Sequence, residues 1–493
     1  MAAPDILLPE YDSPSRKSTI LIAGFNLTAS IMGGGVLSIP FAFSKTGVVL
    51  GSLLMVVAAI TTERAMYLLC LCSRITGAKT YGEVGEAAFG KNMEYFISCA
   101  LCIFLCFAMI GYMVLAKDIW TSVIAVIGKM ETPPNDEFVL GVIIILLVPL
   151  LVQKSLHALR FSCYVGVFSV STLCLALVRH AMAVPTWSNV LLWSTNFEDV
   201  LVAFPIISLS FLGIFNVLPI QNALVKPSRP RIQLVLDGAI ATVFCISLIF
   251  GLAGYLYAGV QTEGNILQNC ESAGDFNLLL GKLGCGTMVI LAIPLMMIPC
   301  RSSLMEIIDV LVNGAHVTPV EVGESEKLPL ITADKTTNSN SSSSNNNNNN
   351  NNANYNYNAM SKKNPNPPQH AGEESQCTSA SPNNNNRQRC NKVTILDNIF
   401  IHYGSTFFLF ASCYMIAVRV PGVAVVWSIL GCSGGYLLAF ILPSALYLKI
   451  LQRYPMHAAS RNNSAWVWFS WALLVTSIVA TFVCTTEAIR SIL

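Results

Sequence analysis

The chain has 493 residues, of which 54% are hydrophobic and only 11% are charged, and its mean hydropathy is +0.58. A soluble globular chain carries about 25% charged residues, so this composition excludes a water-soluble fold and predicts a protein of the membrane. The formal charge is only +2, and the sequence has no Lys/Arg run of the kind that binds nucleic acid, so we expect no nucleic-acid partner.

Eleven stretches of the sequence are long and apolar enough to span a membrane, which requires about 20 residues. In chain order they are 19–44, 47–72, 94–127, 137–153, 158–180, 199–220, 232–258, 277–299, 397–418, 421–448 and 464–486. With the N-terminus in the cytosol, most Lys and Arg residues of the short loops lie on the cytosolic side, as the positive-inside rule requires. The sequence therefore predicts an all-α integral membrane protein with eleven transmembrane helices, a cytosolic N-terminus and a non-cytosolic C-terminus.

These spans divide the chain into four parts. Residues 1–18 form a cytosolic tail, 19–312 contain transmembrane helices 1 to 8, and 393–493 contain helices 9 to 11. The remaining part, 313–392, includes the run SSSSNNNNNNNNANYNYN, and such a composition cannot bury enough apolar surface to fold. We expect this Asn/Ser-rich segment to be a disordered cytosolic loop.

Two polar segments on the predicted cytosolic side have features of their own. The stretch TYGEVGEAAF, 80–89, is short and predicts a helix that lies at the membrane interface. Within the loop, Glu326, Leu330 and Ile331 match the acidic dileucine pattern of endosomal and lysosomal proteins, although chance produces most matches to so short a pattern. A sorting adaptor is therefore a candidate partner, and the plasma membrane and an endosomal, lysosomal or vacuolar membrane are alternative locations.

The first predicted span contains three consecutive glycines, Gly33, Gly34 and Gly35, within the stretch FNLTASIMGGGVLSIPFAF. Each glycine costs about 1 kcal/mol in a helix interior, and Pro40 follows, so this stretch is unsuited to a continuous helix. Inside hydrocarbon, irregular backbone is tolerated only where it is buried or lines a cavity, and transporters use such breaks to bind substrate. Glycines that serve helix packing recur every fourth residue, whereas these are consecutive. We therefore expect a broken helix 1.

The sixth span, VLVAFPIISLSFLGIFNVLPIQ, is interrupted by Pro205, Gly213 and Pro219. Ordinary kinked helices also contain such residues. An inverted repeat of five helices, however, makes the first and sixth spans correspond, so two interrupted spans at these places in the order favour that architecture. The sequence predicts that helices 1 and 6 are both broken.

Four stretches, in this order along the chain, are similar to those of the amino acid/auxin permease family, and most of all to its sodium-coupled neutral amino acid transporter group. FNLTASIMGGGVLSIPFAF resembles the family's first helix, and TYGEVGEAAFG resembles its cytosolic segment after the second. AFPIISLSFLGIFNVLPI with the following KPSRPR resembles the sixth helix and its basic exit, and AIPLMMIPCRSS resembles the eighth. The resemblance implies a LeuT-like fold, a five-plus-five inverted repeat plus one helix, that holds an amino acid between broken helices 1 and 6.

The resemblance also implies which residues bind the substrate. The backbone of helix 1 would hold the carboxylate, and carbonyl and hydroxyl groups of helix 6 would receive the α-amine. An unwound segment suits both charges because it exposes amide donors at one end and carbonyl acceptors at the other. The candidate residues are Met32, Gly33, Gly34 and Gly35 in helix 1, and Ser208, Ser210, Phe211, Gly213 and Asn216 in helix 6.

The residues of ion coupling depart from the sodium-coupled pattern. In those transporters an Asn of the first helix and Thr residues of the eighth are implicated in holding Na⁺, and the matching positions here are Ala29, Ile290 and Ala292. Because these side chains offer no oxygen, proton coupling or ion-independent exchange gains weight. Glu63 is the candidate proton carrier, since an ionisable residue at membrane depth is costly and generally functional. The alternative is that Glu63 and Arg64 reach the cytosolic interface or pair with neighbouring helices.

The leading hypothesis is a secondary transporter that moves small neutral L-amino acids by alternating access. The chief alternative is an amino-acid sensor that binds substrate and signals through its cytosolic segments, and a channel is a third. The sequence has no Walker A, HExxH or GxSxG motif, so we expect no enzyme activity. We expect no cofactor or metal either, because Cys99 and Cys102, although spaced like metal ligands, lie in a hydrophobic helix where packing is the better interpretation.

Overall fold

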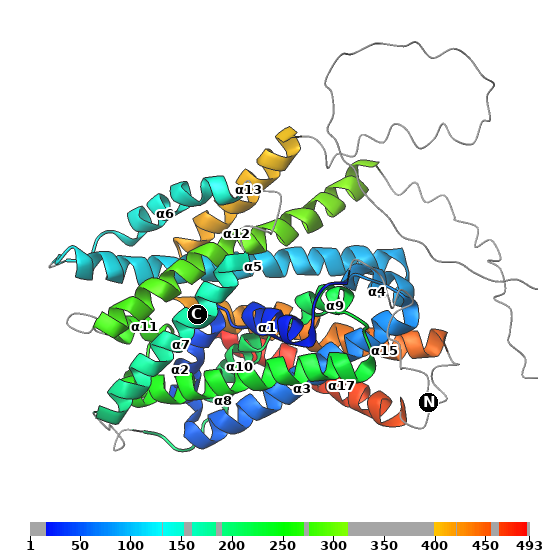
Figure 1. Cartoon of the computed structure of the whole chain (residues 1–493), viewed down its shortest axis with the longest axis horizontal. Coiled ribbons are helices and arrows are strands. Elements are labelled where there is room, and N and C mark those ends of the chain that lie inside the picture. Colours follow the sequence, from blue (N-terminus) through cyan, green and yellow to red (C-terminus); the bar gives the residue numbers. More distant parts are fainter. Residues whose placement is uncertain are drawn as a thin grey trace, which may run out of the picture. The chain divides into compact units, whose positions relative to one another are not determined.

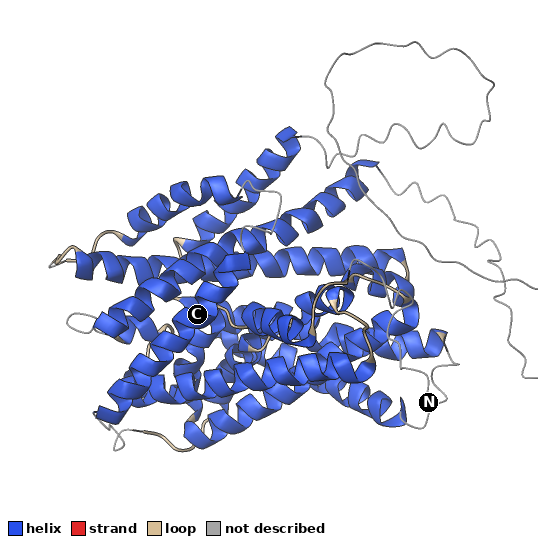
Figure 2. Cartoon of the chain, in the orientation of Figure 1, coloured by secondary structure: helices blue, strands red, loops and turns tan. Residues whose placement is uncertain are grey.

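The computed structural model describes residues 16–130, 132–151, 160–183, 190–270, 276–313, 399–420, 422–454 and 463–490. Within these residues the chain is α-helical without a β-strand, apart from one isolated bridge between Ser18 and Leu224 (Figure 2). Most of the expected tail and nearly all of the Asn/Ser-rich loop lie outside the described residues. The candidate sorting residues Glu326, Leu330 and Ile331 also lie outside the described residues.

The helices coincide with the predicted spans, and the helices on both sides of the Asn/Ser-rich loop belong to one compact unit. The first three elements are α1 (Ile20–Ile31), η1 (Gly34–Ser38) and α2 (Ile39–Thr46), followed by α3 (Val48–Thr76), α4 (Tyr81–Phe89), α5 (Lys91–Ile127), α6 (Asp136–Leu151) and α7 (Arg160–Ala183). The middle of the chain forms α8 (Phe197–Ser210), α9 (Ile214–Ala223), α10 (Arg229–Ala258), η4 (Gly259–Gln261), α11 (Ile266–Asn269) and α12 (Phe276–Asn313). The last part forms α13 (Ile399–Ala417), α14 (Val423–Leu430), η7 (Gly431–Gly435), η8 (Leu437–Ile441), α15 (Leu442–Arg453) and α17 (Asn463–Arg490).

By length and composition, eight helices of the described chain qualify as membrane spans, and α1 joined to η1 and α2 adds a ninth if the bent pair is one span. Each of the eleven predicted stretches contains a helix. However, α6 has only 16 residues, and the apolar part of α13 is limited to Tyr403–Ala417, so both are shorter than the roughly 20 residues of a full span. The count of eleven spans stays a prediction.

The predicted interfacial helix 80–89 is α4, and its boundaries have a local cause. The Thr80 hydroxyl accepts a hydrogen bond from the Glu83 amide at 3.2 Å, while the Glu83 carboxylate accepts one from the Lys79 amide at 2.7 Å. This reciprocal arrangement is a capping box, which satisfies amides that a helix start leaves unbonded. One face of α4 is buried, and Tyr81 donates to the Leu438 carbonyl at 2.8 Å. The segment is therefore a helix, as predicted, that is attached to the helices of the last part of the chain.

The long helix α5 lies at the centre of the helix packing. It has 37 residues, and α12 packs along it (Figure 1). Helices α4, α13 and α14 contact it as well. Outer helix faces instead expose large apolar side chains, such as Leu21 (84% exposed), Phe138 (71%) and Phe482 (73%). In water so many exposed apolar groups would be an aggregation hazard, but on helices of this length they form the surface that meets lipid.

Candidate functional site

The first helix is interrupted where the three glycines were expected to break it. Helix α1 ends at Ile31, Gly33 is extended with φ −115° and ψ −158°, and η1 begins at Gly34. The two halves are bent by 50°. The first hydrogen bond of η1 joins the Val36 amide to the Gly33 carbonyl at 3.3 Å, so the amides of Gly34 and Gly35 precede it. A helix start leaves such amides without partners in the helix, and they point a positive dipole end into the break.

The sixth predicted span is interrupted as well. Helix α8 ends at Ser210, and α9 begins at Ile214. Between them, Gly213 has φ −139° and ψ 10° and is followed by the first bond of α9, from the Asn216 amide to the Gly213 carbonyl at 3.0 Å. The break therefore combines the carbonyl end of one half-helix with the amide end of the next.

The two breaks lie against each other. A Cβ atom on Gly35 would meet the Ser210 Cα at 3.3 Å, and one on Gly213 would meet the Ile31 Cγ1 at 2.6 Å. These glycines thus permit close approach, which is the packing role that the sequence also allowed. Both interpretations hold, because the helix is broken at Met32 and Gly33 and is packed closely on either side.

Tyr112 of α5 contacts the backbone at the first break. The Gly34 amide donates a 2.9 Å hydrogen bond to the Tyr112 hydroxyl, and a Cβ atom on Gly33 would collide with the same hydroxyl. The Trp427 ring of α14 meets the Tyr112 ring edge-on, with centroids 5.7 Å apart, and packs against Gly111. Sequence reasoning missed Tyr112 and Trp427, since both lie in apolar runs whose pattern does not separate them from other aromatic core residues.

Within the part of the chain that the structure describes, several buried polar atoms near the breaks have no hydrogen-bond partner. They include the Ser38 hydroxyl in η1, and the Trp427 indole N–H and the Ser428 hydroxyl in α14. Buried polar groups are normally paired, so a group of them beside two helix breaks indicates a place built to bind something polar. Ser208 of α8, a predicted site residue, lies beside the Tyr436 side chain, and Asn216 is half-buried.

The arrangement matches the chemistry of a zwitterion. The amides at the start of η1 are hydrogen-bond donors at a positive helix end, and the α8 carbonyls near Ser210 are acceptors at a negative one. The Tyr112 hydroxyl accepts from Gly34 and keeps its own proton to donate. The side chains nearest to the glycines of the breaks carry no charge; they are Tyr112, Leu115, Trp427, Ser210, Ile31 and Leu27.

The positions of the sodium-coupled pattern hold no free hydroxyl groups. Ala29 is buried in α1, where its side chain offers no ligand. The neighbouring Ser30 hydroxyl donates to the Leu27 carbonyl at 2.8 Å, and the Thr287 hydroxyl of α12 donates to the Leu283 carbonyl at 2.8 Å. Both hydroxyls donate their protons to carbonyls of their own helices.

Glu63 lies inside the helix packing of α3. Its side chain is buried, and one carboxylate oxygen is 2.8 Å from Nε of Arg64, whose guanidinium lies 5.9 Å from the Trp466 ring. The Asp237 carboxyl of α10 is close enough to interact with it. The ion partner of Glu63 is thus its neighbour on the same helix, and the Arg64 side chain is 40% exposed. The role of Glu63 stays a prediction.

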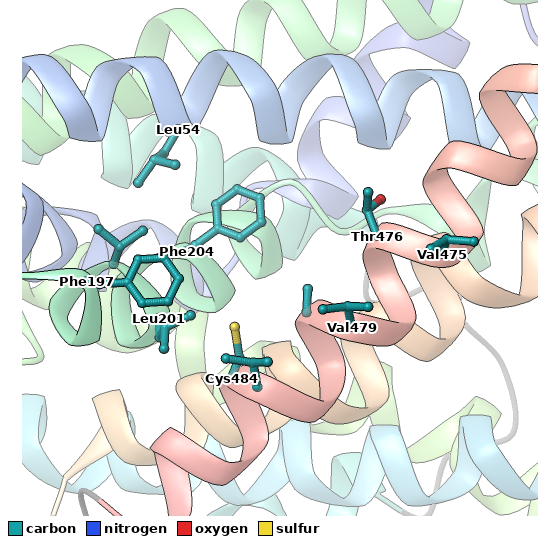
Figure 3. Close-up of a pocket in the computed structure, with 11 residues that line it drawn as sticks. Leu54, Phe197, Leu201, Phe204, Val475, Thr476, Val479 and Cys484 are labelled. Carbon is teal, nitrogen blue, oxygen red and sulfur yellow. The ribbon is translucent and has the colours of Figure 1, made fainter.

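A separate cavity of about 390 Å³ lies between α3, α8 and α17 (Figure 3). Its lining is almost wholly apolar and includes Leu54, Phe204, Val479 and Cys484. A zwitterion placed there would lose its hydration without gaining hydrogen bonds, which is unfavourable. The cavity is therefore distinct from the polar site at the breaks, although both involve α8.

The fold with two broken helices is that of a class of secondary transporters. It is similar to the structure of Mhp1, a nucleobase-cation-symport-1 family transporter, in a closed conformation with bromovinylhydantoin bound, at a TM-score of 0.50 and 11% identity. That similarity covers 98% of this chain and 95% of the other, and it bears out the expected LeuT-like architecture.

A model of the transmembrane amino acid transporter protein family matches residues 16–490, and the chain belongs to this family. It is 26% identical over 466 residues to Vacuolar amino acid transporter 7 of Saccharomyces cerevisiae, which covers 88% of this chain and 89% of the relative. It is 29% identical over 286 residues to Amino acid transporter AVT6E of Arabidopsis thaliana, covering 54% and 58% of the two chains. The resemblance stated from the sequence is confirmed: the protein is a multi-pass membrane transporter of amino acids, and its named relatives are transporters rather than enzymes.

Gly33→Ala tests whether the break needs the Tyr112 hydroxyl in place. The added Cβ would displace that hydroxyl from the Gly34 amide, and a displacement of about 1 Å at a binding site costs on the order of 100-fold in activity. We expect transport to fall by about 10- to 100-fold. Gly24→Ala is the matched control in the same half of helix 1, since a Cβ there meets nothing within 4 Å. Equal activity of both variants in an uptake assay would contradict the assignment.

Tyr112→Phe removes the hydroxyl and leaves the ring. The Gly34 amide then loses its acceptor, at a cost of about 1–3 kcal/mol. We expect the apparent KM for the amino acid to rise about tenfold, which corresponds to 1.4 kcal/mol. Tyr81→Phe removes another buried phenol hydrogen bond, to Leu438, and should lower stability without changing KM. A Tyr112→Phe variant with unchanged KM would remove this residue from the site.

Proposed function

We propose that this chain is a secondary transporter that moves small neutral L-amino acids by alternating access, with the substrate held between the broken helices 1 and 6. The observation that carries the proposal is the contact between the two breaks, at Gly35 with Ser210 and at Gly213 with Ile31. In this proposal the substrate carboxylate binds the backbone of Met32, Gly33, Gly34 and Gly35. The Gly34 amide would then exchange the Tyr112 hydroxyl for the carboxylate, and the Met32 and Gly33 amides would release the carbonyls of Thr28 and Ile31. The α-amine binds carbonyl and hydroxyl groups of Ser208, Ser210, Phe211, Gly213 and Asn216.

The preference for small neutral substrates rests on what surrounds the breaks. The nearest side chains are uncharged, so a charged substrate side chain would have no counter-charge there. A Cβ atom placed on Gly34 would lie 2.6 Å from Leu115 and 3.3 Å from Trp427. These two side chains therefore restrict the space beside the carboxylate site. A large side chain would have to displace one of these groups.

Alternating access requires contacts that close one side of the substrate site and can break. The hydrogen bonds between the start of helix 1 and the end of helix 6 are contacts of this kind. The Ser18 amide donates to the Ala223 carbonyl, and the Val225 amide donates to the Ser18 carbonyl, both at 2.9 Å. Arg16 donates to the Gln221 and Asn222 carbonyls at 3.1 Å and 2.8 Å. With the N-terminus cytosolic, these bonds would join both half-helices on the cytosolic side, and release of substrate there would break them.

Proton linkage is the coupling that the polar residues favour. The side chains at the family's sodium positions, Ala29, Ile290 and Ala292, offer no oxygen, whereas Glu63 is a buried carboxyl with a second carboxyl, Asp237, beside it. Two neighbouring carboxyls repel each other when both are charged. Arg64 supplies the opposite charge when a proton leaves Glu63. A relative named as a vacuolar transporter supports an acidic vacuolar or lysosomal membrane as the location.

Uptake into proteoliposomes that contain the purified full-length chain tests this proposal. We expect saturable uptake of labelled alanine or glutamine that is driven by an imposed pH gradient and is unaffected when choline replaces Na⁺. Strict dependence on Na⁺ would contradict proton linkage. Substrate binding without uptake would instead favour the sensor, and fluxes that do not saturate with substrate would favour a channel.

Glu63→Gln separates coupling from binding, because it keeps the shape of the side chain and removes its titration. We expect accumulation driven by the pH gradient to be lost, while amino-acid exchange at equal pH on both sides is retained. Glu86→Gln in α4 is the matched control, since Glu86 is exposed and lies outside the spans. Gradient-driven accumulation that survives in Glu63→Gln would exclude Glu63 as the proton carrier.

A further inference from the structure

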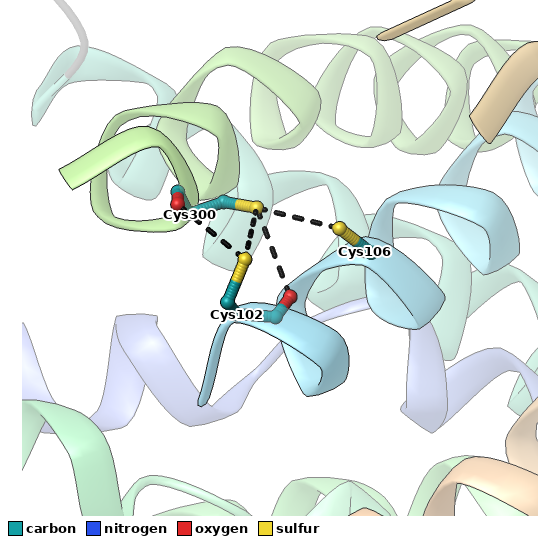
Figure 4. Close-up of side chains that lie close together, drawn as sticks. All are labelled: Cys102, Cys106 and Cys300. Atoms are coloured by element: carbon teal, nitrogen blue, oxygen red, sulfur yellow. Dashed lines mark hydrogen bonds between the residues drawn. The ribbon is translucent and has the colours of Figure 1, made fainter. Parts of the chain in front are cut away.

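Three cysteine side chains from distant parts of the chain converge at one point inside the helix packing (Figure 4). Cys102 and Cys106 lie one turn apart on α5, and Cys300 lies on α12. The Cys300 sulfur is 3.8 Å from that of Cys102 and 3.5 Å from that of Cys106, and all three sulfurs lie within 4.8 Å of one another. Cys102 and Cys300 are buried, whereas Cys106 is half-buried.

The sulfur spacing is that of a thiolate metal site. In a tetrahedral site with metal–sulfur bonds of about 2.3 Å, neighbouring sulfurs lie about 3.8 Å apart. We propose that Cys102, Cys106 and Cys300 bind a soft cation with a filled d shell, Zn²⁺ or Cu⁺, since both favour thiolate ligands. Each coordinating thiol loses its proton to solvent on binding, so the metal replaces protons and no oxidant is involved.

A fourth ligand is within reach. Cys413 of α13 is buried, its thiol donates to the Cys106 carbonyl at 3.7 Å, and it approaches the Cys106 sulfur. Its sulfur lies outside the group of three, so Cys413 would become the fourth ligand only after its side chain moved toward them. The set then draws on α5, α12 and α13, and the ion would fasten these three helices together.

The charge of the site fits its surroundings. Uncompensated thiolates inside the protein would be strongly unfavourable, but a bound cation offsets most of their charge. Arg301, the neighbour of Cys300, is also buried and donates to the Thr406 hydroxyl of α13 at 3.2 Å. Its positive charge compensates part of the remaining negative charge of a thiolate-rich site.

The cluster differs from the pair that the sequence spacing singled out. Cys99 is exposed on α5 and does not take part, so the Cys99 and Cys102 pair does not itself form a metal site. Ordinary packing of cysteine as a small apolar residue is exemplified by Cys285, which is fully buried on α12 away from the cluster. Cys285 therefore offers a matched control on the same helix as Cys300.

Metal binding by the purified full-length chain tests the proposal. The reduced protein would be incubated with Co²⁺, Zn²⁺ or Cu⁺ in separate arms, freed of unbound metal, and analysed for metal content, and the Co²⁺ arm would be read by its thiolate charge-transfer absorption. We expect one ion per chain in at least one arm, displacement of Co²⁺ by Zn²⁺, and a higher thermal unfolding midpoint that a chelator reverses.

Two variants place the ion at the cluster. Cys300→Ser should weaken binding at least about tenfold, because the site loses one of its thiolates, and Cys285→Ser should leave it unchanged. Cys300→Ser changes a buried residue and could prevent folding, so Cys106→Ser, at a half-buried position, serves as the second variant. We expect it to weaken metal binding to a similar extent. The proposal is overturned if no stoichiometric ion binds in any arm, or if Cys106→Ser binds as tightly as the unaltered chain.

Discussion

Inside a membrane every backbone amide and carbonyl needs a partner, and this constraint shapes the whole structure. The described parts of the predicted spans satisfy it mostly with helices. The helix is interrupted at Met32 and Gly33 in the first span and at Phe211 to Gly213 in the sixth. These interruptions are tolerated because they are packed against each other and because Tyr112 accepts the Gly34 amide. In the proposed site the backbone itself would bind a polar substrate, without a buried charged side chain. The long helix α5 has a central part in this arrangement, since it supplies Tyr112 and supports α12 and α14.

The fold was largely predictable because its signals are local. Hydropathy located all eleven helical stretches, and three consecutive glycines located the first break, since both depend on residues that are neighbours in the chain. The partners of the breaks were not predictable in the same way. Tyr112 is separated from Gly34 by 78 positions, and no feature of its neighbourhood marks it as the acceptor of that amide. Likewise, 198 positions separate Cys102 from Cys300, so their meeting is a property of tertiary packing alone.

The proposed coupling residues would change the driving ion without changing the fold. A sodium site needs several oxygen ligands at one point, and Ala29 removes one from the first helix without disturbing its packing. Proton coupling has a weaker geometric requirement, because a single buried carboxyl with a suitable neighbour suffices. Glu63 has such neighbours in Asp237 and Arg64, on α10 and on its own helix. The first helix thus lacks an oxygen ligand for Na⁺, while Glu63 and Asp237 form a buried carboxyl pair elsewhere. Both features are compatible with a transporter that keeps its substrate site and is driven by protons instead of Na⁺.

The cysteine cluster connects to the substrate site through α5. Cys106 and Tyr112 are six residues apart, or about 9 Å along the helix axis, so an ion at the cluster would restrain the same stretch of helix that presents the Tyr112 hydroxyl. The ion would join α5 to α12 and α13, none of which contains the breaks. Movement of helices 1 and 6 is best defined against a rigid set of neighbouring helices, because displacement of those neighbours would change the geometry that binds the substrate. A metal tie among these three helices would therefore stiffen the support while leaving helices 1 and 6 free to change their angle.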